Sequence, residues 1–339
     1  MSNPYLIERS ACPACRSTQH ATLYSRAFCD TPVRQFLESY YRESGRIDMN
    51  DLKDADYTLL ECRDCGLVYQ NAIPGERLME RLYRERTNFD PAKDRSRQHS
   101  SVQYYARHAE LMLTLASHFR KAPHEIQVFD FGLGWAELAT MAVASGFETY
   151  GAELVEAKRQ FARSHGVHVI EWEEIPEHRF DYINADWIFE HLPRPLDTLA
   201  HLRRGLSEHG IIKISVPIGV QIKRQLKVHN WNAPKNSRHS LNAVHPLEHL
   251  NCFEGNSLDK MAAHCELKPF KFPLREQYMI WRWGSAKEAA KAMARPFYHN
   301  WFWKADTHFF TPNGSTEDRM RLPESDQAKR ASAEATQAT

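Results

Sequence analysis

From Ile126 onward, short apolar runs alternate with longer amphipathic stretches, and this alternation constrains the fold more than any other feature of the sequence. The runs have the length of buried strands, and the stretches between them have the three- and four-residue apolar spacing of helices. In order they are IQVFDF, AELATMAVASG, FETYGAE, VEAKRQFARSHG, VHVIEW, FDYINAD, PLDTLAHLRRGLSEHG and IIKISVP. Strands that alternate with helices in this way are typical of a parallel β-sheet covered by helices. The sequence therefore predicts an α/β fold.

Glycines indicate where the helices of this region end. Gly146, Gly166 and Gly210 each follow a helical stretch, and glycine readily takes the left-handed conformation that closes a helix before the next strand. Further along, SLDKMAAHCE is expected to form another helix, and strands near 267–272 and 276–283 are expected to complete the sheet. These positions predict the order of the helices and strands along the sheet.

Two glycines, Gly132 and Gly134, lie between the first predicted strand and its helix, and Glu153 ends the next strand. Glycines allow the backbone to approach a ligand closely, and an acid about 20 residues further on can accept hydrogen bonds from ribose hydroxyls. A dinucleotide site would want a small residue where Glu137 stands, because a carboxylate repels pyrophosphate. Asp130 suits the ammonium and sulfonium charges of S-adenosylmethionine. The pattern favours this cofactor, and a NAD-dependent oxidoreductase is the alternative.

Four segments, namely DFGLGW, GAELVEAKRQFA, FDYINADWIFEHLPRPLDTLAHLRRGLSEHGIIKISVP and HLNCFEGNSLDKMAAHCEL, resemble class I S-adenosylmethionine-dependent methyltransferases in order and spacing. This resemblance implies a Rossmann-like, mostly parallel seven-stranded sheet flanked by helices. It also implies that Asp130, Gly132 and Gly134 line the methionine part of the cofactor and that Glu153 holds its ribose. The other residues expected to line the cofactor are Trp135, Asp186 and Trp187.

The N-terminal region contains two C-x-x-C pairs, Cys12 with Cys15 and Cys62 with Cys65. Two such pairs can converge on one tetrahedral zinc ion, and a site closed by four cysteines is structural rather than catalytic. The sequence therefore predicts a small N-terminal zinc-binding domain. The remaining cysteines, expected to be buried apolar residues, are Cys29, Cys252 and Cys265.

The segment HPLEHLNCF resembles the Glu-His pair of sugar C-methyltransferases, a family that also carries an N-terminal zinc-binding module and a motif similar to CGLVY. The resemblance implies that His249 is the general base, assisted by Glu248; the alternative is that His249 only binds the backbone. His191 in FEHL is the second candidate base. The expected acceptor is a sugar or another small polar metabolite. His99 stands where those enzymes tend to have tyrosine, so oxygen and carbon both stay open as the methylated atom.

Two further motifs have competing interpretations. HPLEH fits the H-x-x-E-H motif of some zinc proteases, but Pro246 directly after His245 disfavours the helix that this motif needs. The basic stretch around Trp231, with Lys223, Arg224, Lys227, Lys235 and Arg238, is either a lid for an anionic acceptor such as a nucleotide-linked sugar or a solvated loop. Neither motif identifies the substrate.

The composition excludes several classes of partner. Lys and Arg total 44 against 43 Asp and Glu, so the net charge of +1 gives no electrostatic case for binding nucleic acid. No apolar run is long enough to cross a membrane, and two C-x-x-C pairs among seven cysteines suit a reducing compartment, so the expected location is the cytoplasm. A non-catalytic interaction protein that docks through its zinc module is the remaining alternative, and the oligomeric state is not predicted.

The sequence divides into segments of different character. The expected segments are a four-cysteine module at 1–72, a helical connector at 73–125, a methyltransferase domain at 126–283 with a substrate-side insertion at 219–247, an aromatic-rich cover at 284–312, and a disordered tail at 313–339.

Overall fold

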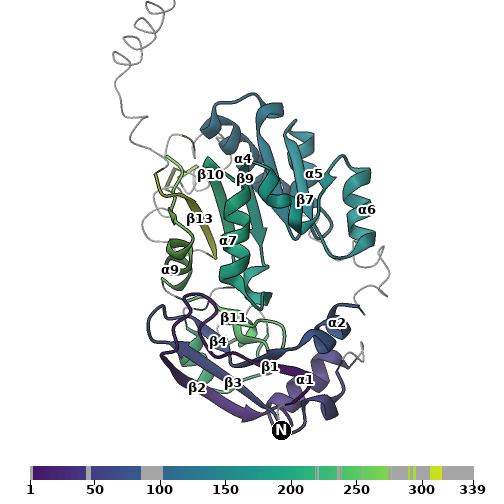
Figure 1. Cartoon of the computed structure of the whole chain (residues 1–339), viewed down its shortest axis with the longest axis vertical. Coiled ribbons are helices and arrows are strands. Elements are labelled where there is room, and N and C mark those ends of the chain that lie inside the picture. The colour runs from purple at the N-terminus through teal and green to yellow at the C-terminus, as the bar shows by residue number, and fades with distance from the viewer. Residues whose placement is uncertain are drawn as a thin grey trace, which may run out of the picture.

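The structure is a computed structural model. It describes residues 3–42, 47–84, 102–217, 219, 221–234, 237, 239–254, 256–273, 276, 289–290, 293–294 and 306–314. Several predictions concern residues outside these ranges: the strand over 277–283, most of the cover at 284–312, the tail from 315, and the side chains of His99, Lys235 and Arg238. The described residues form an α/β layer and, below it in Figure 1, an N-terminal module.

A seven-stranded sheet is the centre of the α/β layer, with the order β12-β13-β10-β9-β6-β7-β8. Its strands are β6 (Gln127–Phe131), β7 (Glu148–Ala152), β8 (His168–Val169), β9 (Phe180–Asp186), β10 (Leu206–Ser215), β12 (Leu267–Pro269) and β13 (Thr307–Pro312). Only β13 runs antiparallel to its neighbours, β10 and β12, and the pairs among β6 to β10 are parallel. The predicted mostly parallel, Rossmann-like fold is confirmed.

Helices follow the strands as the sequence predicts. They are α4 (Val102–Phe119), α5 (Glu137–Ala144), α6 (Glu156–Ser164), α7 (Pro195–Gly205) and α9 (Ser257–His264), with short 3₁₀ turns η2 (Pro123–Glu125), η3 (Trp172–Glu177) and η4 (Phe189–His191). Met112 and Leu115 of α4 share a buried core with Val128 of β6 and Leu138 of α5. The helix expected in a connector therefore packs on the sheet.

The predicted helix ends are correct at two glycines and wrong at the third. Gly146 and Gly166 have φ of +84° and +83°, just past α5 and α6. However, α7 ends at Gly205, and Gly210 lies within β10. A Cβ on Gly205 would lie 2.5 Å from the carbonyl oxygen of Ile175, so close packing of α7 on η3 requires glycine there.

The last strand of the sheet also differs from the prediction. β13 comes from Thr307–Pro312, a part of the expected cover, and inserts between β12 and β10. Within the predicted strand over 276–283, the one described residue, Glu276, is not in a strand. The short FFTP run gave too weak an alternation to be distinguished from its aromatic surroundings.

The N-terminal module contains a four-stranded antiparallel sheet with the order β11-β4-β3-β2 and a two-stranded sheet of β1 and β5. Its elements are β1 (Leu6–Glu8), β2 (His20–Ala27), α1 (Val33–Tyr41), η1 (Met49–Leu52), β3 (Asp56–Cys62), β4 (Val68–Gln70), β5 (Ala72–Pro74) and α2 (Glu76–Arg84). The edge strand β11 (Asn251–Cys252) comes from far along the chain and pairs with β4. The module is therefore completed by residues that lie between β10 and β12 of the seven-stranded sheet in sequence.

The insertion at 219–247 forms much of the module's hydrophobic core. It contains α8 (Ile222–Leu226) and η5 (Asn242–Val244), and buried Ile222, Trp231 and Val244 cluster with Leu37 of α1 and Tyr57 of β3. The hydroxyl of Tyr57 donates a hydrogen bond to the carbonyl oxygen of Val244. The segment expected on the substrate side thus packs on the module, as the green ribbons within the lower body of Figure 1 show.

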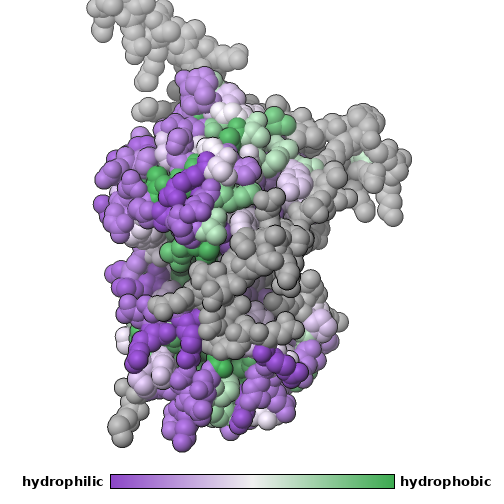
Figure 2. Space-filling model, turned by 90° about the vertical axis from the view of Figure 1, so that its right-hand side faces the viewer, coloured by the Kyte–Doolittle hydropathy of each residue, from purple (hydrophilic) through white to green (hydrophobic). Residues whose placement is uncertain are grey.

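The surface of the described part is mainly hydrophilic on the face shown in Figure 2, with hydrophobic residues in scattered groups. No helix among the described residues is both long enough and apolar enough to cross a membrane.

Removing a buried side chain of α7 should destabilise the α/β layer. Leu199 is fully buried in the core shared by α7 and the sheet, so Leu199→Ala is expected to lower the free energy of unfolding by about 2–5 kcal/mol. Leu113→Ala, in α4 where the leucine is 52% exposed, should change it by less than about 0.5 kcal/mol. Urea unfolding measures both values, and equal losses would contradict the proposed core.

Candidate functional site

The predicted cofactor residues gather where the parallel strands end. Asp130 lies near the end of β6, Glu153 follows β7, and Asp186 ends β9. In an open α/β sheet, ligands bind outside the carboxyl ends of the strands. The three acids are therefore at the edge where a cofactor is expected.

The glycine loop after β6 needs its two glycines for different reasons. Both have positive φ, +81° for Gly132 and +54° for Gly134. A Cβ on Gly132 would lie 2.4 Å from Cδ1 of Ile188, whereas a Cβ on Gly134 would meet no atom within 4 Å. Gly132 allows the segment after β9 to pack on the loop, and Gly134 leaves open space where a ligand can approach the backbone.

The carboxylate of Glu153 faces this loop. Its Oε2 accepts a hydrogen bond of 2.9 Å from the backbone N–H of Gly134, and its Oε1 accepts bonds of 2.8 and 3.0 Å from those of Leu154 and Val155. A carboxylate has about four lone-pair sites, so these three bonds leave one on Oε2. A ribose hydroxyl can use it without displacing the loop.

Two acids, the buried Asp130 and the half-buried Asp186, and one lysine lie along the centre of this edge. Asn184 Nδ2 donates to Asp130 Oδ1 at 2.7 Å, and Lys213 Nζ donates to Asp186 at 2.7 Å and to Asn184 Oδ1 at 3.1 Å. Burial raises the pKa of Asp130 to about 7. Burial also acts to raise the pKa of Asp186, but the Lys213 ammonium holds it below its ordinary value. A cationic ligand would therefore stabilise ionised Asp130.

The two tryptophans predicted near the cofactor have different surroundings. The Trp135 ring is buried, edge-on to Phe161 of α6 at 5.5 Å, with Lys158 Nζ 6.0 Å from its centre. Trp187 has φ of +56° and remains 48% exposed, while its backbone N–H donates a hydrogen bond to the carbonyl oxygen of Ser215. Trp187, rather than the Trp135 side chain, is available to cover a ligand at this edge.

Sequence reasoning missed two side chains of α4. Burial and the hydrogen bond to Glu137 raise the pKa of Tyr104 well above its ordinary value, and the charges of Asp186 and Asp130 add to this. The ring of His108 lies 4.3 Å from that of Tyr104. Their spacing of four residues, which puts both on one helix face, was the available signal. The helix brings them to the acidic edge of the sheet.

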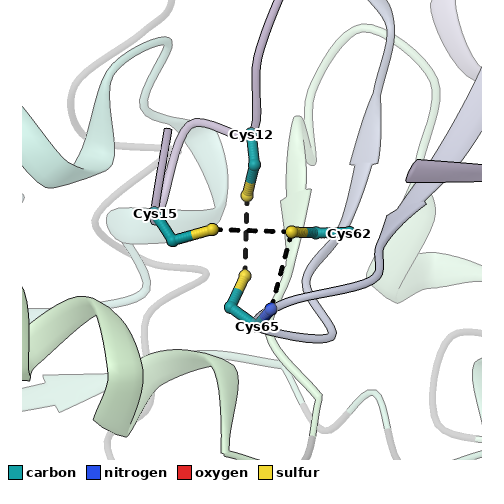
Figure 3. Close-up of side chains that lie close together, drawn as sticks. All are labelled: Cys12, Cys15, Cys62 and Cys65. Atoms are coloured by element: carbon teal, nitrogen blue, oxygen red, sulfur yellow. Dashed lines mark hydrogen bonds between the residues drawn. The ribbon is translucent and has the colours of Figure 1, made fainter. Parts of the chain in front are cut away.

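The four predicted zinc ligands converge from two distant pairs, and their side chains point toward a common centre in Figure 3. The distances Cys12 Sγ to Cys65 Sγ and Cys15 Sγ to Cys62 Sγ are both 3.5 Å, and all four sulfurs lie within 4.8 Å of one another. These contacts are too long for disulfides, whose sulfurs are about 2.05 Å apart. Zinc–sulfur bonds of about 2.3 Å separate tetrahedral ligands by about 3.8 Å. The cluster thus fits a tetrahedral ion.

Within the second C-x-x-C pair, Cys62 favours the thiolate, whereas the hydrogen bond to Cys12 and burial raise the pKa of Cys65. Burial acts to raise the pKa of Cys62, but backbone N–H groups of Cys65 and Asp64 that hydrogen-bond to its sulfur lower the pKa below its ordinary value. Cys65 N lies 3.5 Å from Cys62 Sγ, and Gly66 at φ of +80° makes the turn possible. Metal ligation uses the thiolate form.

The predicted acceptor end brings together His191, His249 and an acid that the sequence analysis did not select, Glu190. The two imidazole rings lie 4.8 Å apart, and Glu190 Oε1 is 3.8 Å from His191 Nε2. Burial raises the pKa of Glu190 to about 8 and lowers the pKa of His249 to about 3. His249 is therefore neutral at neutral pH.

Glu248 faces away from this group. Its carboxylate accepts hydrogen bonds from the hydroxyls of Tyr40 at 3.2 Å and Tyr41 at 2.9 Å, both from α1. Its backbone carbonyl oxygen, by contrast, is 2.8 Å from His191 Nδ1. The side chain therefore ties the segment to the N-terminal module.

Buried polar side chains of the module and of β11 hold the segment that carries His249. Gln70 Nε2 donates to the carbonyl oxygens of His245 and His249, both at 2.9 Å. Asn251 Nδ2 donates to those of Phe189 and Leu192, at 2.9 and 2.8 Å. The module thus determines where His249 lies relative to η4.

The described residues of the H-x-x-E-H motif and of the basic stretch around Trp231 do not form the ligand-binding arrangements considered from the sequence. Residues 246–248 form a turn, with Leu247 at φ of +66°, so the helix that a zinc protease motif needs is not formed. In the basic stretch, Lys223 pairs with Glu61 and Trp231 is buried against Tyr24. The described part of this stretch packs on the module and offers little support for an anion-binding lid.

Comparison with known proteins identifies one matching family, described as a methyltransferase domain, which matches residues 100–269, half of the chain. The match begins before the predicted boundary at 126 and includes α4, in agreement with the packing of that helix on the sheet. A search of curated protein sequences finds no match.

Similar solved structures are methyltransferases of low identity. The plantazolicin methyltransferase BpumL in complex with SAH is 12% identical with a TM-score of 0.40, over 62% of this chain and 84% of that one. CalS10, an amino pentose methyltransferase from Micromonospora echinaspora, is 17% identical with a TM-score of 0.30, over 38% and 56%. PKMT2 from Rickettsia typhi is 12% identical with a TM-score of 0.38, over 60% and 53%. At these scores the neighbours carry no argument about substrate.

Replacing Asp130 by asparagine should change how stability depends on pH. The folded pKa of about 7 exceeds the unfolded value of about 3.9, so wild-type stability from this group is complete below about pH 4 and falls as pH rises toward 7. Asp130→Asn keeps the acceptor for Asn184 and cannot ionise. Relative to wild type, the variant should gain up to about 4 kcal/mol between about pH 4 and pH 7. Urea unfolding across this range tests it, and a constant difference would contradict burial of the acid.

Proposed function

Because the chain belongs to the family described as a methyltransferase domain, we propose that it transfers the methyl group of S-adenosylmethionine to a small polar acceptor, a sugar or a related metabolite. The methyl acceptor attacks the methyl carbon in line, the carbon–sulfur bond breaks with its electron pair going to sulfur, and S-adenosylhomocysteine leaves. Since the sulfonium is already a good leaving group, the protein mainly aligns the reactants.

One observation carries this proposal, the pairing of the Glu153 carboxylate with the N–H of Gly134 at a strand-to-helix turn. It presents an acceptor for ribose hydroxyls beside open backbone. The acids Asp130 and Asp186 nearby suit a cationic methyl donor, whereas they would repel the pyrophosphate of a nicotinamide cofactor. The family match favours the same cofactor over NAD.

For the acceptor end, we propose that His249 and His191 contact the acceptor hydroxyl. His191 ends η4, shortly after Asp186. A neutral imidazole can accept a hydrogen bond and orient the attacking oxygen. Glu248 is assigned to positioning, because its carboxylate is bound by Tyr40 and Tyr41. Oxygen is the preferred methylated atom, and carbon is the alternative. A nucleotide-linked sugar is one candidate acceptor, with the basic stretch as its only support.

For the cysteine cluster, we propose one structural zinc ion held by Cys12, Cys15, Cys62 and Cys65. Its support is the convergence of four sulfurs at near-tetrahedral separations. We also propose the cytoplasm as the location, because two C-x-x-C pairs among seven cysteines suit a reducing compartment.

Removing the Glu153 carboxylate should weaken cofactor binding. Loss of a hydrogen bond to a charged group costs about 1.5–3 kcal/mol, so Glu153→Ala should bind S-adenosylhomocysteine about 10- to 100-fold more weakly than wild type. Calorimetric titration of both proteins gives the dissociation constants, with NADH titrated in parallel.

Glu156→Ala is the matched control, because this exposed acid at the start of α6 contacts Arg159, Gln160 and Arg163 of its own helix. It should bind as wild type does. Binding of NADH in place of the homocysteine product would favour the oxidoreductase. A folded protein that binds neither would favour a non-catalytic docking role.

Removing one cysteine of the cluster should release zinc and destabilise the module. Loss of a structural metal is among the changes that destabilise proteins most. Cys62→Ser is therefore expected to lower the free energy of unfolding by about 4 kcal/mol or more. Metal analysis should give one zinc per wild-type chain and less in the variant.

Cys29→Ser is the control for this change, because Cys29 lies in the same module outside the cluster, with its thiol near the carbonyl oxygen of Met49. It should retain zinc and stability. Zinc-free wild-type protein of unchanged stability would overturn the assignment.

A further inference from the structure

Glu190, His191 and His249 form a second group with the composition of a metal site, separate from the cysteines. One ligand atom from each lies within 4.8 Å of the others. Two of these residues come from η4, after β9, and the third from the segment before β11. Two imidazoles and one carboxylate bind divalent transition metals and leave positions open for other ligands.

The hydrogen bond of His191 fixes which of its nitrogens faces the group. Its Nδ1 lies 2.8 Å from the carbonyl oxygen of Glu248, which can only accept, so Nδ1 carries the proton. In the neutral ring, Nε2 then bears a lone pair, and it lies 3.8 Å from Glu190 Oε1. At this distance, a cation held between the nitrogen and the carboxylate oxygen can satisfy both atoms, as can a proton on either one. A histidine whose second N–H donates to a backbone carbonyl is typical of metal ligation.

Glu190 Oε2 and His249 Nδ1 are buried and have no hydrogen-bond partner among the described residues. The Glu190 side chain is only 1% exposed. An unpaired carboxylate oxygen out of water is costly, and such groups are usually paired or bound to a metal. A cation would supply the missing interaction for both atoms.

The two segments are locked together by buried amides. Asn251 binds the backbone on both sides of Glu190 and His191, through Phe189 and Leu192, and Gln70 binds the carbonyl of His249. Ligand positions are therefore fixed by the backbone before any ion binds. Such preorganisation is what a functional metal site needs.

We propose that Glu190, His191 and His249 bind a divalent transition-metal ion whose open positions take two adjacent oxygens of the methyl acceptor. Mixed nitrogen and oxygen ligands favour Mn²⁺, Fe²⁺ or Zn²⁺ over the oxygen-seeking Ca²⁺ and Mg²⁺. The acceptor class is then a vicinal diol or an α-hydroxy acid, which chelates through both oxygens.

This inference rests on the proposed function and specifies its acceptor end. Glu190, His191 and His249 would hold the ion, which would lower the pKa of a hydroxyl bound to it, and the released proton would pass to solvent. The resulting oxygen forms the bond to the methyl carbon as the carbon–sulfur bond breaks. His249 then acts as a ligand, and the methyl group goes to oxygen.

Calorimetric titration of zinc-loaded full-length protein with Mn²⁺, and in parallel with Zn²⁺, tests the site. We expect one further ion per chain, bound at least about tenfold more weakly by Glu190→Gln and by His249→Gln. His264→Gln is the control for ion binding, because this exposed histidine in the last turn of α9 lies outside the group, and it should bind as wild type does.

S-adenosylhomocysteine is titrated into the same samples, so that the two proposals fail separately. Wild-type protein that binds the homocysteine product but no further ion, or variants that bind the ion as tightly as wild type, would overturn the metal site alone. Should the wild type bind an ion but not the homocysteine product, the proposed function fails. If one variant does not fold, the other decides the result.

Discussion

Hydrogen bonds from Gln70 and Asn251 hold the His249 segment and η4 against the N-terminal module, and the arrangement of the acceptor end depends on them. Gln70 ends β4, the strand that follows the second C-x-x-C pair, and Asn251 lies in β11, the strand that completes the module's sheet. Both side chains are buried, so water cannot replace the hydrogen bonds that either amide makes. A shift of the segments relative to each other would therefore leave several polar groups without hydrogen bonds. The cysteine module is therefore part of the scaffold of the site.

Local patterns predicted where Gly132, Gly134 and Glu153 lie in the fold, whereas their binding of the cofactor stays a prediction. Gly132, Gly134 and Glu153 were found because a strand, a tight turn and a helix leave signatures within a few residues of one another. The four cysteines were found because ligand spacing is also local. Their convergence is now seen, whereas their zinc stays a prediction.

Features that depend on distant contacts escaped prediction. Gly205 ends α7 because the helix packs closely on Ile175, and nothing in the local sequence distinguishes it from Gly210. The β13 strand acquires its place only from β10 and β12. Glu190 was overlooked and Glu248 chosen, because which acid faces the histidines depends on two tyrosines of α1 that no spacing rule connects to them.

The composite sheet of the module has a consequence for the order of events during synthesis. All four clustered cysteines lie within the first 65 residues, so the two C-x-x-C pairs can meet as soon as that stretch leaves the ribosome. The strand β11 and the apolar residues of α8 and η5, which complete the same core, are translated much later. Until then the module exposes an unpaired β4 edge and an uncovered apolar face, both of which invite association with other chains. An ion bound early by the cysteines would keep this incomplete module compact until β11 has been synthesised.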